Sequence, residues 1–402
     1  MSELIAYLKS PAAIRERCDR IFQLCCEGKC HFRVDLTQLD KVADYVIEVM
    51  RDEYPDFNIP FHSRWRHFEV GNVSRITELD DALAELNPIE KAQVKFDLAI
   101  TSVLLDAGAG ANWQYRERET GPVFRRSEGL AVASFRMFCQ GAFSSNLKLP
   151  LQADADGLQN LTKQTLAEGF QVSLENPLVG VEGRVNLLQK LGQVLCQYPQ
   201  FFGNNNPRPG NLVNYLLSQS FDGKLKASTV LKTILTGLGD IWPGRIVLAG
   251  ENLGDVWVHP ALPKDEQYIP FHKLSQWLTY SLLEPLQELG LEIIGLEELT
   301  GLPEYRNGGL CLDLGLLQAH SDVFQKCHAV DSEVIVEWRA LTVSLLDKIA
   351  EIIRQKLNLS AAELPLVKVL QGGTWSAGRK IAAELREGGV PPIQIESDGT
   401  VF

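Results

Sequence analysis

The residue types best suited to chemistry stand together in the segment 299–309, where Glu304, Tyr305 and Arg306 are adjacent. A Gly-x-Pro sequence precedes these three residues and a pair of glycines follows them. Glycine and proline suit tight turns and close approach of a ligand to the backbone. A solvated surface turn is one interpretation, since loops are usually exposed. Because apolar helical patterns flank the segment on both sides, we favour a site in which Glu304 is the catalytic carboxylate.

A second cluster, at residues 60–68, carries Arg64, Trp65, Arg66 and His67. Arginine presents a planar fork that matches phosphate or carboxylate, and tryptophan offers a flat face for a base or a sugar. The alternative is a stacked cluster of arginine and tryptophan that joins two helices. We predict that these four residues bind substrate, and that the two arginines hold a phosphate if the substrate carries one.

The third cluster follows a glycine-containing turn at residues 250–260. Asp255, Trp257 and His259 alternate along a possible strand, so their side chains are expected on one face. A carboxylate, an indole and an imidazole on one face indicate a pocket wall, and a half-exposed hairpin is the competing interpretation. We predict a catalytic role for Asp255 and substrate binding for Trp257 and His259.

A fourth polar pair, Glu337 and Arg339, opens an apolar helical pattern that continues through residues 341–357. A carboxylate near a helix N-terminus interacts favourably with the helix dipole, and this alone could explain Glu337. We count Arg339 among the substrate-binding residues.

Helical periodicity dominates the elements that must position these clusters. Apolar residues recur at spacings of three and four in the segments 36–52, 88–106, 183–198, 271–290 and 341–357. Strand patterns are few and short, at residues 245–250 and 255–259 and around Ile393 and Ile395, before an Asp398-Gly399 hairpin turn. We predict a mainly α fold, a single compact helical unit over residues 1–402 with a small β-sheet or hairpins. The clearest possible break lies near residues 203–210.

Composition narrows the class of protein. The chain has 402 residues, of which 45% are hydrophobic and 22% are charged, which is typical of a globular protein. Its net charge of −12 argues against nucleic acid or a membrane as a partner, because both are bound by basic faces. No N-terminal signal pattern or long apolar run is visible. We therefore expect a cytoplasmic protein whose partner is a small molecule.

The eight cysteines do not form an obvious framework. Cys25, Cys26, Cys30 and His31 suggest a metal cluster at first sight, but two of these cysteines are adjacent and no second Cys-x-x-Cys pair follows. Free thiols are the favoured interpretation, and we expect neither a metal nor another cofactor.

Several motifs together resemble one known group, the uracil-catabolism protein 4 family, over essentially the whole chain. They are Glu175–Gly180 with Glu182–Arg184, Phe271–Trp277, Leu302–Gly309, Val336–Thr342 and Ser397–Phe402. The resemblance implies a role in a pyrimidine-degradation route in which uracil is ribosylated and its ring is opened, giving a ribosylurea-type intermediate.

The order of features is also similar to that of the queuosine-salvage nucleoside hydrolases, helical proteins that cut an N-glycosidic bond. Lys273 with its following helix, the turn at Glu304–Arg306 and the Glu-x-Arg at residues 337–339 occur in the same order. The turn acid is aspartate in those hydrolases, and a second aspartate of theirs falls near Ser281 here. Because urea is a poor leaving group, its release needs a proton donor, and we predict Lys273 or Tyr305 in this role.

Together these features predict a metal-independent N-ribosyl hydrolase that cleaves ribosylurea, or its 5-phosphate, to urea and ribose or ribose phosphate. An amidohydrolase acting on the ureido group and a non-catalytic binding protein of the same pathway are the alternatives. We further predict that residues 55–70, 250–260, 271–281 and 301–309 converge on one pocket that accepts a nucleoside-like or nucleotide-like molecule.

Overall fold

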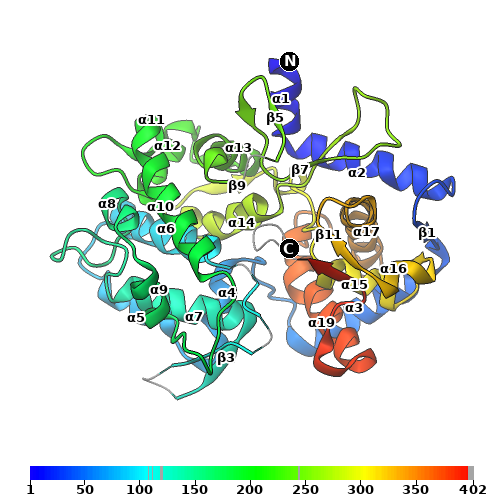
Figure 1. Ribbon diagram of the computed structural model, residues 1–402, viewed down its shortest axis with the longest axis horizontal. Helices are drawn as coiled ribbons and strands as arrows, with labels where there is room; N and C mark the ends of the chain where they lie inside the picture. Colours follow the sequence, from blue (N-terminus) through cyan, green and yellow to red (C-terminus); the bar gives the residue numbers. More distant parts are fainter. Residues whose placement is uncertain (107, 111, 118–120, 243–244, 397–402) are drawn as a thin grey trace. The chain divides into compact units, whose positions relative to one another are not determined.

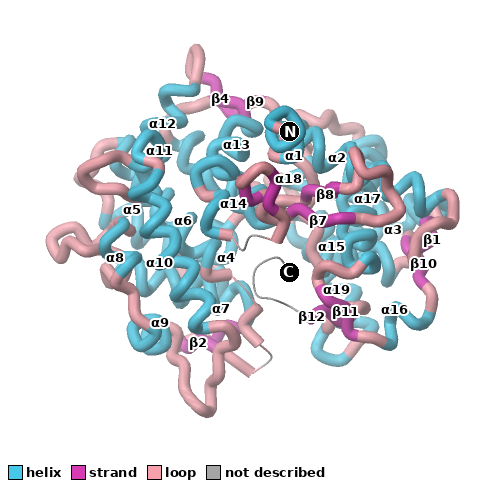
Figure 2. Tube along the Cα trace, turned by 45° about the horizontal axis from the view of Figure 1, so that its top comes forward, coloured by secondary structure: helices cyan, strands magenta, loops and turns pink. Residues whose placement is uncertain are grey.

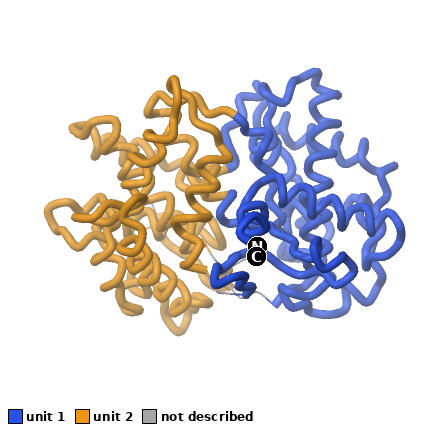
Figure 3. Tube along the Cα trace, turned by 90° about the horizontal axis from the view of Figure 1, so that it is seen from above, with its two compact units in different colours: residues 1–62, 244–276, 295–402 blue, residues 63–243, 277–294 orange. Residues whose placement is uncertain are grey.

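The computed structural model describes residues 1–106, 108–110, 112–117, 121–242 and 245–396. The chain divides into two compact units, which Figure 3 shows in blue and orange. Unit 1 comprises Met1–His62, Gly244–Gln276 and Gly295–Phe402, and unit 2 comprises Ser63–Pro243 and Trp277–Ile294. Helix α14 (Lys273–Glu288) contributes its first turn to unit 1 and the remainder to unit 2. The single-domain expectation for residues 1–402 stays a prediction.

The mainly helical class is confirmed, and Figure 1 shows helices throughout both units. The described strands are short and pair two by two among the helices (Figure 2). The antiparallel pairs are β1 (Phe32–Val34) with β10 (Leu317–Ala319), β2 (Gln114–Arg116) with β3 (Val123–Arg125), β5 (Val247–Leu248) with β6 (Glu251–Asn252), and β7 (Val256–Val258) with β8 (Tyr268–Pro270). The parallel pairs are β4 (Lys224–Lys226) with β9 (Glu292–Ile294) and β11 (Cys327–Ala329) with β12 (Gln394–Glu396).

Unit 1 is built around one long helix. Its helices besides the start of α14 are α1 (Ser2–Leu8), α2 (Pro11–Cys26), α3 (Leu39–Glu53), α15 (Tyr305–Asp313), α16 (Ser321–Gln325), α17 (Glu333–Leu357), α18 (Leu366–Val369) and α19 (Trp375–Leu385). Helices α2, α3 and α15 pack against α17. Every residue of α17 from Val334 to Leu346 is buried, including Glu337 and Arg339. Because a buried charge is costly without a partner, both of these residues must be paired inside the unit.

Unit 2 packs around α6 and α7. Its helices besides α14 are α4 (Arg64–Phe68), α5 (Arg75–Ala82), α6 (Pro88–Leu104), α7 (Arg126–Cys139), α8 (Ala155–Gln159), α9 (Lys163–Gly169), α10 (Val181–Gln197), α11 (Pro199–Phe202), α12 (Leu212–Gln219) and α13 (Ala227–Gly237). Helix α6 starts with a capping box between Asn87 and Glu90, which satisfies the backbone amide groups of these two residues.

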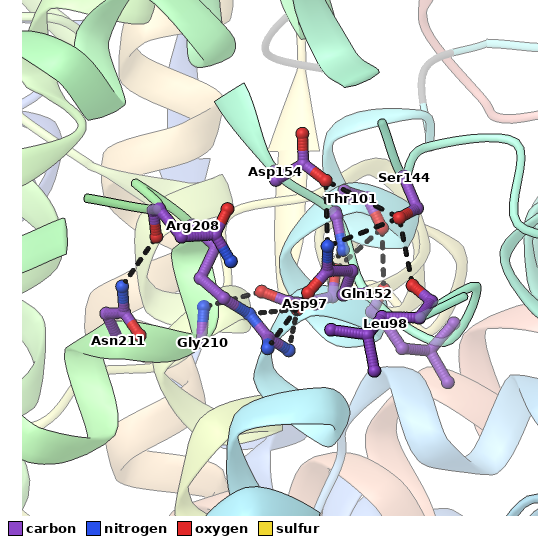
Figure 4. A network of polar contacts seen from close by, with 12 residues as sticks. Asp97, Leu98, Thr101, Ser144, Gln152, Asp154, Arg208, Gly210 and Asn211 are labelled. Carbon is purple, nitrogen blue, oxygen red and sulfur yellow. Dashed lines mark hydrogen bonds and ion pairs between the residues drawn. The ribbon is translucent and has the colours of Figure 1, made fainter. Parts of the chain in front are cut away.

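The loop predicted as a possible break, residues 203–210, is anchored inside unit 2 by the carboxylate of Asp97 (Figure 4). Asp97 accepts hydrogen bonds from Arg208 Nε at 2.8 Å, from the Gly210 amide at 2.6 Å and from the Ala153 amide at 3.1 Å. Burial raises the pKa of Asp97 to about 6, although the Arg208 charge lowers it. The network therefore joins α6 to two loops and makes this segment part of the packed unit.

Most predicted elements lie where their patterns placed them. The strand expected at residues 245–250 is limited to β5, and the helix expected over residues 271–290 is α14, which contains Pro285. At the C-terminus β12 pairs in parallel with β11, while the Asp398-Gly399 hairpin turn lies outside the described residues. Among the helices of the described segments, none has the length and apolar character needed to cross a membrane.

Candidate functional site

Glu304 is the N-cap of α15. Its Oε1 accepts a hydrogen bond from the Asn307 amide at 2.6 Å, and its Oε2 accepts one from the Arg306 amide at 2.7 Å. These bonds satisfy two of the amide groups that a helix leaves free at its first turn. The side chain is 8% exposed, so the carboxylate is held in place and largely withdrawn from water. Each oxygen retains a lone pair for a further donor.

The glycines after this segment serve helix packing, so the turn expected through them is wrong. Gly308 lies inside α15, where a Cβ atom would come within 2.7 Å of both Thr342 Oγ1 and Trp338 Nε1 on α17. A side chain at this position would force the two helices apart. A pair of glycines is compatible with a turn or with a close helix contact, and only the packing partner distinguishes the two.

Burial raises the pKa of Glu304 above its ordinary value, while the two amide hydrogen bonds and the charges of Lys273 and Arg306 lower it. The Arg306 charge therefore lowers this pKa, but the effect of burial is larger and the net shift is upward. The Arg306 guanidinium donates to the Gly389 carbonyl at 2.7 Å and lies over the Tyr305 ring, 4.9 Å from its centroid. It ties α15 to the segment that follows α19, and its substrate-binding role stays a prediction.

Asp255 and Arg339 form a bidentate ion pair, with Nη1–Oδ1 and Nη2–Oδ2 each 2.8 Å. The indole of Trp257 donates to Oδ1 at 2.7 Å, and the Lys273 amide donates to Oδ2 at 3.0 Å. The Arg339 charge and these hydrogen bonds hold the pKa of Asp255 well below its usual range despite burial. With two donors on each oxygen, Asp255 is a fixed anion that positions the first residue of α14.

The strand β7 and its neighbours place the third cluster. Trp257 is 5% exposed, and Arg245 lies over its ring at 5.1 Å. His259 is 1% exposed, and its Nε2 lies 3.1 Å from Oε1 of Glu337. Asp255 thus contacts Arg339, and His259 contacts Glu337. These two contacts join the two ends of strand β7 to helix α17. The sequence did not identify Glu337 as a partner because dipole stabilisation at a helix N-terminus already accounted for it.

The second cluster belongs to unit 2, where Arg64 is fully buried. Its Nε donates to Ser102 Oγ at 2.7 Å, its Nη1 pairs with Asp106 at 2.9 Å, and the guanidinium lies over the Trp277 ring at 5.5 Å. The Trp65 indole donates to the Ser281 carbonyl at 2.7 Å. These contacts match the stacked cluster given as the alternative, and substrate binding by either residue stays a prediction.

Arg66 and His67 complete this cluster. Arg66 pairs with Glu69 at 3.2 Å and with Glu284 at 2.9 Å, and the His67 ring packs edge-on against Trp277 at 5.7 Å. Ser63 Oγ also donates to Glu284.

Glu284 is a carboxylate that the sequence patterns did not single out. It lies one turn after Ser281, where the second aspartate of the resembling hydrolases falls, and burial raises its pKa. In the sequence, Glu284 is a glutamate within an apolar helical pattern, and such a position is equally typical of an exposed residue. The pattern therefore did not identify it.

The structure therefore brings the predicted residues together in two groups. Unit 1 holds Glu304, Tyr305, Arg306, Asp255, Trp257, His259, Lys273 and Arg339, and unit 2 holds Arg64, Trp65, Arg66 and His67. Within unit 1 the Asp255–Arg339 ion pair holds the backbone of Lys273, whose charge acts on the buried Glu304 carboxylate. A carboxylate, a lysine and a tyrosine are groups able to transfer protons, and the carboxylate can stabilise positive charge. Convergence of both groups on one pocket stays a prediction.

The amino-acid sequence was compared with known proteins and protein families. The chain is 38% identical to "Uracil catabolism protein 4" of Lachancea kluyveri over 99% of both chains, and 40% identical to "Protein urg3" of Schizosaccharomyces pombe over 100% of both. Residues 7–402 match the family described as "Protein of unknown function (DUF1688)". By this match and by the identity to both relatives, the chain belongs to the DUF1688 family.

Proposed function

We propose that this protein acts in uracil catabolism as an N-ribosyl hydrolase that cleaves ribosylurea, or its 5-phosphate, to urea and ribose or ribose phosphate. The place in uracil catabolism is supported by the printed name of one relative, which is 38% identical over nearly its full length. The reaction is supported chiefly by one observation: the buried, doubly hydrogen-bonded carboxylate of Glu304, whose pKa is influenced by the nearby Lys273 charge.

Cleavage of an N-glycoside develops positive charge on the sugar carbon before water attacks it. A fixed carboxylate next to that carbon stabilises this charge and can accept a proton from the attacking water. Glu304 suits both roles because its two amide hydrogen bonds hold it in one orientation. A group fixed in advance does not have to reorganise when the charge develops.

In this step the bond between the ribosyl carbon and the urea nitrogen breaks, and a new bond forms between that carbon and the water oxygen. One water proton passes to Glu304. The departing nitrogen receives a proton from Lys273 or Tyr305, since neutral urea is a far better leaving group than its anion. Glu304 then returns its proton to the solvent or to that donor, and the site is restored.

Asp255 and Arg339 are positioning residues in this proposal. The Asp255 carboxylate holds the Lys273 amide, and Arg339 holds the carboxylate through two parallel hydrogen bonds. The first turn of α14 is thereby fixed within unit 1, and with it the backbone that carries the Lys273 side chain. Such support lets a proton donor act without losing conformational entropy at each turnover.

The direct test is to incubate the purified protein with ribosylurea and with its 5-phosphate, and to measure urea and ribose or ribose phosphate. Equal release of urea and sugar from one of the two compounds supports the proposal. Release of ammonia and carbon dioxide would identify an amidohydrolase. Binding without turnover of either compound, by protein shown to be folded, would identify a binding protein. Both of these results overturn the hydrolase assignment.

A further inference from the structure

A cluster of metal-ligating side chains lies around Glu337, in unit 1 and apart from the Glu304 carboxylate. Sγ of Cys25, Sγ of Cys30 and a carboxylate oxygen of Glu337 all lie within 4.8 Å of one another. Cys25 and Glu337 are buried, and Cys30 is half-buried. Two ligand atoms at ordinary zinc distances of about 2.0–2.3 Å, in a tetrahedral site, are roughly 3.3–3.8 Å apart. Small side-chain rotations are therefore sufficient for these three atoms to bind one ion.

Local backbone geometry brings the two thiols together. Helix α2 ends in a Schellman motif, in which the Gly28 amide donates to the Cys25 carbonyl at 3.0 Å and the Lys29 amide donates to the Leu24 carbonyl at 3.0 Å. Gly28 has a φ of +74°, the left-handed conformation that favours glycine at this position. The chain reverses there and returns Cys30 to the end of the helix that carries Cys25.

The third group comes from α17, which packs against α2. The His31 amide donates to Oε2 of Glu337 at 2.8 Å, so the carboxylate is bound directly to the segment that carries Cys30. Oε1 lies 3.1 Å from Nδ1 of His31 and 3.1 Å from Nε2 of His259. Carboxylates that bind a metal are themselves held by hydrogen bonds from neighbouring groups, and the His31 amide and the two imidazoles can supply these here.

The charges around Glu337 also favour a cation. This carboxylate is 1% exposed, and its ion-pair contacts among the described residues are to the two imidazoles, with no lysine or arginine. The Nδ1 atom of His259 is buried and has no hydrogen-bond partner in the described part of the chain. A buried carboxylate beside two thiols and two imidazoles has little fixed positive charge to offset it.

We propose that Cys25, Cys30 and Glu337 bind a zinc ion, with His31 and His259 supporting the carboxylate. Two sulfur ligands select a soft or borderline metal over magnesium or calcium. Binding replaces the two thiol protons by the metal, so up to two protons are released to the solvent. Three protein ligands leave the fourth tetrahedral position to water or a small ligand. The proposal is independent of the hydrolase assignment.

The test measures metal in the full-length protein, purified without chelators, by elemental analysis and by titration with Co²⁺ after metal removal. We expect about one zinc per chain, and a sulfur-to-cobalt charge-transfer absorption in the Co²⁺ form. Cys25→Ser with Cys30→Ser should abolish both signals. The matched control is Cys26→Ser, at the adjacent and exposed cysteine, which should retain both. His259→Ala should weaken metal affinity by about 10–100-fold, the usual effect of losing an outer support.

Circular dichroism identifies variants that fail to fold. If the double cysteine variant fails to fold, Glu337→Gln, which keeps the side-chain shape, replaces it. Substoichiometric zinc together with no charge-transfer band in the wild-type protein overturns the proposal. So does equal zinc retention by the double cysteine variant and Cys26→Ser. A disulfide between Cys25 and Cys30 in freshly purified protein, found by mass spectrometry without reduction, overturns it as well.

Discussion

Arg339 and Asp255 bind each other through two parallel hydrogen bonds of 2.8 Å, and the carboxylate also accepts from the Lys273 amide. A helix residue 1% exposed is thereby joined to the residue just before strand β7 and to the start of α14. Both residues were predicted to act on substrate, Asp255 as a catalytic group and Arg339 as a substrate-binding residue. Their mutual contact makes stability the first property to measure.

We expect Asp255→Asn to lower the free energy of unfolding by about 3–5 kcal/mol, because it leaves the buried Arg339 guanidinium without its counter-ion. Chemical denaturation measures this directly. Asp347→Asn is the matched control, since the Arg15–Asp347 pair is about one-third exposed on both sides, and such pairs contribute roughly 0–1 kcal/mol. Equal losses in the two variants would contradict a supporting role for the buried pair.

Glu304→Gln tests the proposed chemistry. The change removes the charge and keeps the shape, so turnover of the ribosyl substrate should fall by about 10²–10⁴-fold. Loss of one strong helix cap should cost only about 1 kcal/mol of stability, leaving the protein folded. Glu297→Gln, at an exposed glutamate nearby, should have neither effect. Near wild-type turnover by folded Glu304→Gln protein would transfer the catalytic role to another residue.

The pH dependence of kcat/KM gives a second measure of Glu304. Burial raises its pKa, so the ionised form needed to accept a proton is lost at a higher pH than for an ordinary glutamate. Activity should therefore fall on the acid side at a pH above about 4.5, the region where free carboxylates titrate. The same limb should be missing from the residual activity of Glu304→Gln.

Arg64 and Arg66 should respond differently to truncation, although they are two residues apart. Arg64→Ala removes a fully buried guanidinium from Asp106 and should cost about 3–5 kcal/mol of unfolding free energy. Arg66 is partly exposed, and its loss should cost about 1 kcal/mol. If the cluster holds a phosphate, Arg66→Ala should weaken binding of the 5-phosphate more than binding of the free riboside. Equal weakening of both compounds would indicate a purely structural pair.

His62 should make the protein less stable in mild acid. Burial lowers its pKa to about 4, against about 6.5 in an unfolded chain, while its Nδ1 lies 3.0 Å from Gln371 Oε1. Between these values the unfolded chain takes up the proton and the folded chain does not. The stability that the neutral, buried His62 contributes is therefore fully present above about pH 6.5. The free energy of unfolding falls by roughly 3 kcal/mol as the pH falls to about 4.

Replacing His62 by glutamine should remove this part of the pH dependence, measured as the difference in unfolding free energy between pH 7 and pH 4. The matched control is His320→Gln, at an exposed histidine, which should leave the wild-type dependence in place. An unchanged slope in the His62 variant would show that other groups cause the loss.

The sequence by itself determined the class of fold and the positions of its long helices. The apolar stripe of residues 341–357 indicated a helix because residues three and four apart share one helix face, and α17 contains the whole stripe. The family motifs were equally local, since each is a short run of neighbouring residues. The same reasoning located Glu304, although it assigned the glycines that follow to a turn.

Only the tertiary structure decided which polar side chains meet. Asp255 and Arg339 are separated by 84 residues, and Cys30 and Glu337 by about 300, so no local period relates them. The cysteines had been interpreted as free thiols because two of them are adjacent and no second Cys-x-x-Cys pair follows. The packing of helix α17 on α2 places Glu337 beside Cys25 and Cys30. Side-chain pairing across such contacts depends on the arrangement of helices in space, which residue spacing along one chain segment does not contain.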